Sequence, residues 1–187
     1  MKHSQMREII LDTETTGICR KSKDPSNNHG IIEIACVELI NREPSGNHFH
    51  AYVNPSPIEI DDKATKIHGI KQDFLEDKPS FDSIADELLE FIGDSPIIIH
   101  NAPFDISFLN REFSKLNKSK QPQRNFRYTD TLEIARSIFP HERNDLNTLA
   151  RKFCVNINRE KHGALTDCEI LAHVYKALTV ETSFPAY

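Results

Sequence analysis

The chain has 187 residues, of which 38% are hydrophobic and 27% are charged, and its formal net charge is -5. A chain of this length and average composition can bury its own core as one domain, without disulfides or a structural metal. The acidic balance excludes a protein that holds nucleic acid by bulk positive charge, because neutralising phosphates needs clustered Lys and Arg. Any activity on nucleic acid must therefore recruit cations or a partner.

The N-terminus and the cysteines indicate the compartment. The first apolar run, Ile9 to Leu11, is too short for a signal peptide or a membrane span. The four cysteines form no Cys-x-x-Cys pair and lack the paired spacing of a zinc site. We therefore expect a cytoplasmic protein with free thiols and no membrane contact.

The first third of the chain has the pattern of strands. Glu8 to Thr13 is an apolar run that ends in polar residues, which is typical of a central strand that delivers its carboxyl end to a loop. Cys19 to Gly30 is polar and predicts an exposed loop. Ile31–Ile40 and Asn47–Val53 then predict a hairpin, with the turn over Asn41–Gly46.

The rest of the chain alternates helices with short strands. Apolar residues recur there at helical spacing, and several segments begin at residue types that cap helices. The predicted helices are Ser80–Ile92, Asn101–Leu116, Leu132–Phe139, Asp145–Phe153 and Ala164–Leu178, with Ser80, Asn101 and Asp145 as caps, and the predicted strands are Pro96–His100 and Tyr128–Asp130. A hairpin followed by strands that helices separate implies an α/β class, with a mixed sheet flanked by helices.

Two polar segments remain outside this pattern. Ser114–Arg127 contains five Lys and Arg residues and no acid, so we expect a solvated loop; contact with a phosphate backbone is the alternative. Residues 179–187 follow the last predicted helix, and terminal disorder is expected there. Because no repeat or linker divides the chain, residues 1–178 are predicted to form one domain.

Two acidic residues end the first predicted strand. Asp12 and Glu14 are two positions apart, so the period of a strand points both carboxylates to the same side. Like charges so placed raise each other's pKa unless a cation holds both ionised, and hard oxygen ligands suit Mg²⁺ or Mn²⁺. The alternative is a polar turn whose side chains bond the backbone, and the pair alone favours that alternative.

Two further acids lie on predicted helices. Asp105 is near the third position of its helix, where a carboxylate favours the helix dipole, but Phe108 and Leu109 give it apolar neighbours. Asp167 shares a face of the final helix with apolar residues, where an unpaired carboxylate is costly. His162 precedes Asp167 by five residues, about 140° around a continuous helix, so it must lie on the preceding loop to face the same site. A lone His is more often structural, and only this neighbour singles it out.

Three stretches of the sequence resemble the motifs of the exonuclease family named for its Asp-Glu-Asp-Asp acids plus His. These stretches are Leu11–Gly17, His100–Asp105 and His162–Asp167. Their order and separations match the family, and three motifs in order are specific where one would be weak. The segments most similar to the proofreading epsilon subunits of bacterial DNA polymerase III are Ile31–Ile34, Asn41–Arg42, Gly46–His50 and His68–Ile70. The resemblance implies a ribonuclease H-like fold with a five-stranded mixed sheet.

The resemblance also implies an activity and roles for the acids. The activity is 3′-5′ exonuclease on DNA, with two Mg²⁺ or Mn²⁺ ions per active site and nucleoside 5′-monophosphates as products. By this likeness Asp12 bridges the two ions. Glu14, Asp105 and Asp167 complete their ligands, directly or through water. His162 takes the proton from the attacking water.

A substrate pocket for the terminal nucleotide is implied next to these acids. By the motifs it is lined by Thr15, His68, His100 and Phe104, together with Asp12, Glu14 and Asp167. Ordinary packing or loop polarity is the alternative for Thr15, His68, His100 and Phe104. Lys63 departs from the family pattern, because the polymerase subunits often have an acid there.

The implied substrate is a DNA 3′ end, single-stranded or frayed. The partners that the resemblance implies are the alpha and theta subunits of polymerase III and the sliding clamp. Glu181–Tyr187 resembles the clamp-binding peptide of the epsilon subunits, and terminal disorder is the alternative for this segment. Residues 1–178 would be the catalytic domain. Two alternatives stay open, an exoribonuclease of the same family and an accessory module that does not cut. All four acids and His162 are present, which speaks against the accessory module.

Overall fold

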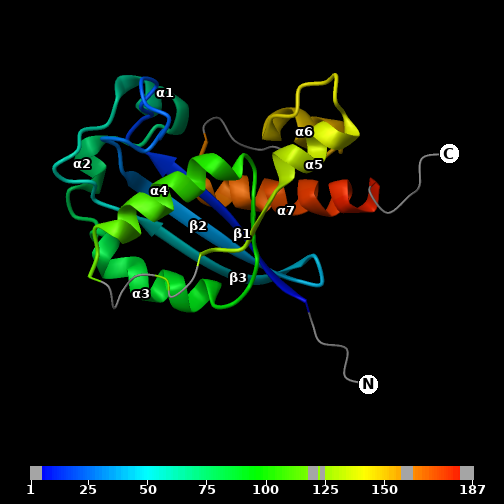
Figure 1. The fold of residues 1–187 in the computed structure, drawn as a ribbon, viewed down its shortest axis with the longest axis horizontal. Coiled ribbons are helices and arrows are strands. Elements are labelled where there is room, and N and C mark those ends of the chain that lie inside the picture. Colours follow the sequence, from blue (N-terminus) through cyan, green and yellow to red (C-terminus); the bar gives the residue numbers. More distant parts are fainter. Residues whose placement is uncertain (1–5, 118–121, 123–124, 157–161, 182–187) are drawn as a thin grey trace.

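A five-stranded mixed sheet forms the centre of the computed structural model, which describes residues 6–117, 122, 125–156 and 162–181 (Figure 1). The strands are β1 (Arg7–Thr15), β2 (Ile31–Ile40), β3 (Glu43–Tyr52), β4 (Ile97–Ile99) and β5 (Tyr128–Asp130), in the order β3-β2-β1-β4-β5. The β1–β2 and β2–β3 pairs are antiparallel, and the β1–β4 and β4–β5 pairs are parallel. The predicted class, α/β with a mixed sheet, is confirmed.

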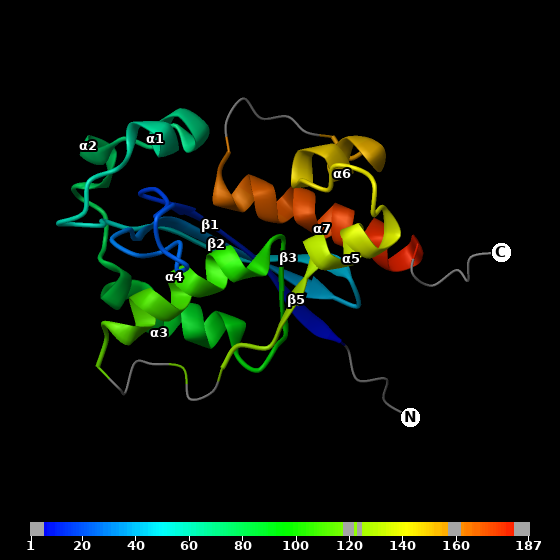
Figure 2. The ribbon, with the colours of Figure 1, turned by 45° about the horizontal axis from the view of Figure 1, so that its top comes forward.

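Helices cover both faces of this sheet. Their bounds are α1 Asp62–His68, α2 Gln72–Leu75, α3 Phe81–Ile92, α4 Ala102–Ser114, α5 Thr131–Ile138, α6 Leu146–Lys152 and α7 Ala164–Glu181. Figure 2 shows α3 and α4 together on one side of the strands and α7 on the other. Among the described residues, no helix has the length and apolar content needed to cross a bilayer.

The alternation of β1 divides the core into two layers. Ile9 and Leu11 are fully buried in the cluster that contains α3 and α4. Ile10, which points to the opposite face, is buried against α7 together with Leu171 and Ala172. Because β1 is covered on both faces, it is a near-continuous apolar run up to its polar end. That end is where side chains from the two layers can meet.

The hairpin turn is shorter than predicted. Asn41 and Arg42 form the turn with positive φ angles of 52° and 66°, and pairing resumes at once between Ile40 and Glu43. Two residues with positive φ match the right-handed twist of the flanking strands. The prediction of Asn47 as the start of β3 was wrong because the first residues of this strand are exposed and therefore lack hydrophobic alternation.

Several element ends also differ from the sequence prediction. Asp145 accepts a hydrogen bond from the Thr148 N–H and caps α6 as predicted. Ser80 and Asn101 occupy cap positions, but neither side chain accepts a hydrogen bond from a backbone N–H of the helix that follows. Helix α7 continues to Glu181, three residues beyond the predicted Leu178, since no Pro or Gly interrupts it there. Residues 182–187, like Lys118, Lys120 and Arg124 of the basic segment, lie outside the described residues.

Candidate active site

The carboxyl end of β1 carries the two predicted acids on the face that α7 covers. Across the β1–β2 ladder, Asp12 pairs with Ala35 and Glu14 pairs with Glu33. The Cys168 thiol on α7 donates to the Ala35 carbonyl at 3.4 Å. The small Ala35 side chain, fully buried, permits this close approach. The first turn of α7 is therefore held against the strand end that carries Asp12 and Glu14.

Glu14, His162 and Asp167 form the one group of side chains in the described part of the chain that is suited to hold a metal ion. Each offers a ligand atom, and these atoms lie within 4.8 Å of one another. The His162 Nδ1 atom lies 3.0 Å from Asp167 Oδ2, and Asp167 is buried. Two carboxylates and an imidazole at this spacing fit a divalent cation such as Mg²⁺ or Mn²⁺ by their donor chemistry.

His162 lies on the loop before α7, where the angular argument placed it. Its backbone N–H donates to the Ile67 carbonyl on α1 at 3.2 Å. The Asp167 N–H donates to the Gly163 carbonyl at 2.9 Å, so α7 starts immediately after His162. These two bonds fix the backbone at His162 and Gly163, and the imidazole lies against Asp167 in the first turn of the helix.

Asp105 lies on the other face of β1. It is buried on α4, and its Oδ1 atom accepts a hydrogen bond from the Thr13 hydroxyl at 2.7 Å. Burial raises the pKa of Asp105 to about 7, although the Thr13 hydrogen bond acts in the opposite direction. Thr13 stands between Asp12 and Glu14 in the strand, so its side chain points away from theirs. Neither Asp105 nor Asp12 belongs to the group of ligand atoms around His162.

A pocket of about 560 Å³ lies next to Glu14. Its walls are the loop after β1, helix α1 and the start of α4; in Figures 1 and 2 that loop and α1 lie side by side. Four of the residues predicted to bind substrate line the pocket, namely Glu14, Thr15, His68 and Phe104. Asp12, His100 and Asp167 are not among its lining residues. The other lining residues are Gly17, Ile18, Cys19, Arg20, Lys21, His29, Asp61, Lys63, Ala64 and Ile67.

The wall between the loop and α1 depends on Gly17. A Cβ atom at this position would come within 2.5 Å of Asp61 Oδ2 and 2.7 Å of the His29 ring. The Asp61 N–H also donates to the Thr16 carbonyl at 2.8 Å. Glycine therefore allows the loop to approach the start of α1 closely enough to form a continuous wall.

His68 is the last residue of α1 and is buried. Gly69, with φ of 78°, ends the helix and donates its N–H to the Thr65 carbonyl. The Nδ1 atom of His68 accepts a hydrogen bond from the Ile70 N–H at 3.0 Å. Because Nδ1 is an acceptor, the neutral ring carries its proton on Nε2. The backbone turn thus fixes both the position and the tautomer of this imidazole.

His100 has partners on the other side of β4. Its Nδ1 atom lies 2.9 Å from the Thr131 hydroxyl, which donates to the Ile99 carbonyl. Burial lowers the pKa of His100, against the opposing effect of Asp130. The neighbouring Asp130 carboxylate accepts from the Asn101 and Leu132 N–H groups, both at 2.9 Å. These contacts hold the turn that leads from β4 into α4, and they match the alternative of a packing role for His100.

Sequence reasoning missed several residues around the site. Thr13 was passed over, although strand alternation already places it opposite the acids on either side. Asp61 carried no signal, because the helix that it precedes, α1, is short and its residues are mostly exposed. Ile18 and Ile67 are 43% and 54% exposed beside the pocket, an unusual position for two apolar side chains.

Comparison with known proteins gives consistent matches over almost the whole chain. Residues 9–175 match the family model described as Exonuclease. DNA polymerase III subunit epsilon of Rickettsia typhi is 51% identical over 178 residues, which cover 94% of this chain and 75% of that protein. The corresponding subunit of Escherichia coli is 44% identical over 175 residues, with 92% and 71% covered.

Solved structures show the same fold. Exonuclease X in complex with 5′ overhanging duplex DNA aligns with a TM-score of 0.70 and 25% identity, over 96% of this chain and 95% of that one. The nuclease domain of 3′hExo, a DEDDh family member bound to rAMP, aligns with a TM-score of 0.74 and 17% identity, over 98% and 95% of the two chains. The predicted ribonuclease H-like architecture is confirmed by these neighbours.

Proposed function

Because this chain belongs to the exonuclease family, we propose that it is the proofreading exonuclease of a bacterial DNA polymerase III, which removes nucleotides one at a time from the 3′ end of a DNA strand. Membership makes the chain a 3′-5′ exonuclease, a hydrolase of a metal-dependent family. The DNA substrate, the polymerase partner and the details of the mechanism are the proposal.

The group formed by Glu14, His162 and Asp167 carries this proposal. It brings two carboxylates and an imidazole within 4.8 Å of one another, and one of the carboxylates, Glu14, also lines a pocket of about 560 Å³. Ligand atoms for a cation and a general base therefore lie beside a space that can take a nucleotide. An accessory module that only binds would not need this combination.

We assign the metal ligands to the four acids. Asp12, Glu14, Asp105 and Asp167 would hold two Mg²⁺ or Mn²⁺ ions, directly or through water, because hard divalent cations prefer carboxylate oxygens. Ions bound there would stabilise the charge that develops on the phosphoryl oxygens. Asp105 must lose its proton to join them, and its raised pKa opposes this step in the protein alone.

His162 is the proposed general base. Its Nδ1 atom lies 3.0 Å from the Asp167 carboxylate, which leaves Nε2 to take a proton from the attacking water. In that arrangement Asp167 orients the imidazole and stabilises it once it is protonated. The product is a nucleoside 5′-monophosphate and a strand shortened by one nucleotide.

The pocket would hold the terminal nucleotide. Phe104 packs against Phe108 with ring centroids 4.9 Å apart, so its ring is braced from behind. Ile18 and Ile67 present apolar surface to the pocket, which suits the face of a base. The Nε2–H of His68 is a donor that suits an oxygen of the sugar or phosphate. Thr15 donates to the Gly17 carbonyl, so it shapes the loop.

The proposed function is tested with a 5′-labelled primer and purified protein. We expect a ladder of strands shortened from the 3′ end, and 5′-mononucleotides as products, only when Mg²⁺ or Mn²⁺ is present. Asp12→Ala should abolish this ladder, with a loss of at least about a thousandfold. Persistent cleavage by this variant, purified in parallel with the wild type, would falsify the metal assignment.

Substrate class needs its own comparison, because an exoribonuclease of this family remains the second candidate. Matched, mismatched and RNA-ended strands should be compared in one assay with the same protein. Faster release from mismatched DNA ends than from matched ends is expected for a proofreading enzyme, because a frayed end reaches the pocket more easily. A preference for the RNA-ended strand would favour the exoribonuclease.

The proposed partners are the alpha and theta subunits of polymerase III and the sliding clamp, by analogy with the epsilon subunits named above. Residues 1–178 would act as the catalytic domain, with residues 179–187 outside it, and the protein would work in the cytoplasm. Co-elution of the chain with each partner on size-exclusion chromatography tests these assignments one by one.

A further inference from the structure

Three cationic side chains gather around the pocket. Arg20 and Lys21 lie on the loop after β1, and Lys63 lies in the first turn of α1. They come from segments about forty residues apart in a chain with a formal net charge of -5. Because the chain as a whole is acidic, its overall charge does not explain why cations from two segments line one pocket.

None of these three cations forms an ion pair with a carboxylate anywhere in the described ranges. Other surface cations of the chain do, as in the Lys176–Glu43 and Lys152–Glu142 pairs. Arg20, Lys21 and Lys63 are all exposed, so the charged groups are accessible to a ligand. The acids that line the same pocket are Glu14 and Asp61, and Glu14 belongs to the metal-ligand group.

The segments that carry the cations are held together by the backbone. The Asp61 N–H donates to the Thr16 carbonyl, and Gly17 lets the Asp61 carboxylate approach the loop. The Cys19 N–H donates to the Pro25 carbonyl at 2.9 Å, which closes the loop that contains Arg20 and Lys21. The cations are therefore attached to one supported wall, although their side chains are long.

We propose that Arg20, Lys21 and Lys63 bind phosphates of the DNA strand upstream of the nucleotide that is removed, an inference that rests on the proposed exonuclease function. Glu14 and the metal ligands would face the bond that is cut, and Ile18 and Ile67 would face the base. The cations supply the attraction for a polyanion that the acidic chain otherwise lacks. Binding of this kind is independent of sequence and weakens as salt rises.

The test compares two double variants of equal charge. Arg20→Ala with Lys21→Ala removes two of the proposed contacts. Arg127→Ala with Lys176→Ala removes two cations that contact Asp94 and Glu43 instead. The KM for a single-stranded dodecanucleotide and for the 4-nitrophenyl ester of thymidine 5′-monophosphate is measured with Mn²⁺ over a range of KCl concentrations.

For the dodecanucleotide we expect the first double variant to raise KM about tenfold at low salt and to lower the slope of log KM against log salt by about 1.4, about 0.7 for each lost phosphate contact. The increase in KM should be smaller for the ester, which has no upstream phosphate. The second double variant should keep the wild-type slope. Arg20→Lys with Lys21→Arg should restore the slope, because charge rather than shape carries the effect.

The outcomes separate this inference from the proposed function. If the wild type releases mononucleotides and the first double variant keeps the wild-type KM and slope, the phosphate contacts are wrong and the exonuclease assignment stands. A wild type that cuts neither substrate with either metal overturns the proposed function itself. Repeating the assay with a dodecanucleotide that ends in a 3′-phosphate distinguishes backbone from terminal phosphate: an effect of the double variant only on that strand would overturn the backbone contact.

Discussion

Acidic side chains that lie beside the two ends of β1 have pKa values shifted in opposite directions, Glu38 of β2 at the amino end and Asp105 of α4 at the carboxyl end. At the amino end, Glu38 accepts hydrogen bonds from Ser45, Arg7 and Asn47, at 2.6, 2.5 and 2.9 Å. Bonds from Ser45, Arg7 and Asn47, in that order, lower the pKa of Glu38 to about 2. At the carboxyl end, Asp105 has the neutral hydroxyl of Thr13 as its hydrogen-bond donor, and burial raises its pKa to about 7.

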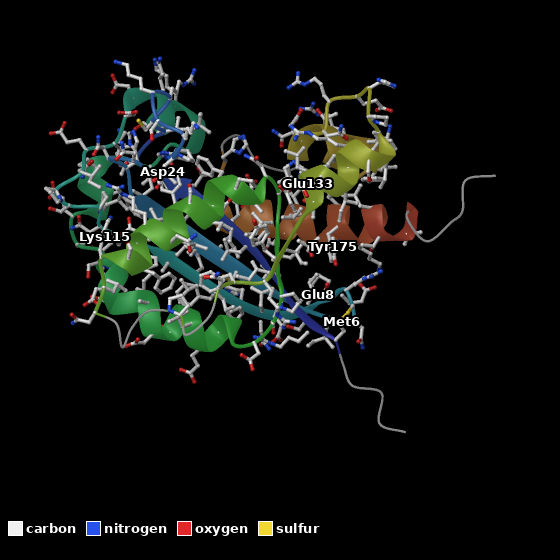
Figure 3. The ribbon with its side chains drawn as sticks, viewed as in Figure 1. Met6, Glu8, Asp24, Lys115, Glu133 and Tyr175 are labelled. Carbon is white, nitrogen blue, oxygen red and sulfur yellow. The ribbon has the colours of Figure 1, made fainter. Side chains whose placement is uncertain are left out.

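The amino end of β1 is a structural junction. The Arg7 guanidinium also donates to the Ile92 and Phe91 carbonyls, at 3.0 and 2.7 Å, and so ties β1 to the end of α3. Tyr175 on α7 donates to Glu8 at 2.8 Å; Figure 3 labels both side chains. Paired acids stabilise one arrangement of the fold. At the carboxyl end, burial of an acid that keeps a raised pKa is typical of a functional site that costs stability.

The largest expected effect is the loss of turnover in His162→Ala, which tests the role proposed for His162 at the carboxyl end of β1. His162→Ala should lower turnover by about 10²- to 10⁴-fold, because a positioned general base contributes that much to a proton transfer. The Kd for Mn²⁺, measured by isothermal titration calorimetry, should change by less than about threefold. The control is His173→Ala, which removes an exposed histidine on α7, the helix that follows His162. A loss of Mn²⁺ affinity as large as the loss of turnover would make His162 a ligand rather than a base.

The amino end should show the reverse pattern. Arg7→Ala removes the hydrogen bonds to Glu38 and to the end of α3, and should lower the free energy of unfolding by about 2 to 4 kcal/mol. Urea denaturation measures this loss, and kcat on a DNA strand should stay at the wild-type value. Arg127→Ala, which removes one bond to the Asp94 carbonyl, should cost much less. A fall in kcat for Arg7→Ala would break the division between the two ends.

The third prediction concerns the pH dependence of stability without metal. Folding raises the pKa of Asp105 to about 7, so its protonated form contributes stability that is fully present below the ordinary pKa and is lost as pH rises through about 7. In EDTA, Asp105→Asn should therefore gain about 1 to 3 kcal/mol relative to the wild type between pH 5 and pH 8. Parallel stability profiles of the two proteins would contradict the raised pKa.

The smallest expected effect tests the Thr13 hydroxyl, which donates a hydrogen bond to Asp105. Thr13→Val keeps the shape of the side chain and removes the hydrogen bond to Asp105, which stabilises the charged carboxylate. The variant should lose about 1 kcal/mol of stability at pH 8 and bind Mn²⁺ a few times more weakly there. Thr179→Val, the same change near the end of α7, should leave Mn²⁺ binding as in the wild type. Equal effects of the two variants would mean that the Thr13 bond does not tune Asp105.

The sequence predicted the parts of the site that depend on local periodicity. The period of two placed Asp12 and Glu14 on one face of β1, and the helical period placed His162 on the loop before α7. The hairpin and the order of the later helices follow from the same patterns. Local periodicity could not predict that all four acids converge, because their convergence depends on how the helices pack on the sheet. That prediction came from the family resemblance. The structure groups Glu14 and Asp167 with His162 and puts Asp105 against Thr13.

Helix α1 shows why the pocket could not be predicted in full. It has seven residues, and only His68 is buried, so it lacks the apolar stripe that reveals longer helices. Its position comes from contacts distant in sequence, such as the Asp61–Thr16 backbone bond. The resemblance pointed to Lys63 and to the segment around His68, but only the fold shows that α1 lies beside the loop after β1, where Arg20 and Lys21 line the same pocket.

The hydrogen bond from the His162 N–H to the Ile67 carbonyl connects the wall of the pocket to the residue proposed as general base. Ile67 lines the pocket proposed for the terminal nucleotide, and His162 is the proposed general base. An ill-seated base that pushes α1 outward would pull on the peptide that aims the imidazole. The fit of the terminal base and the rate of hydrolysis would then be coupled through this one backbone hydrogen bond.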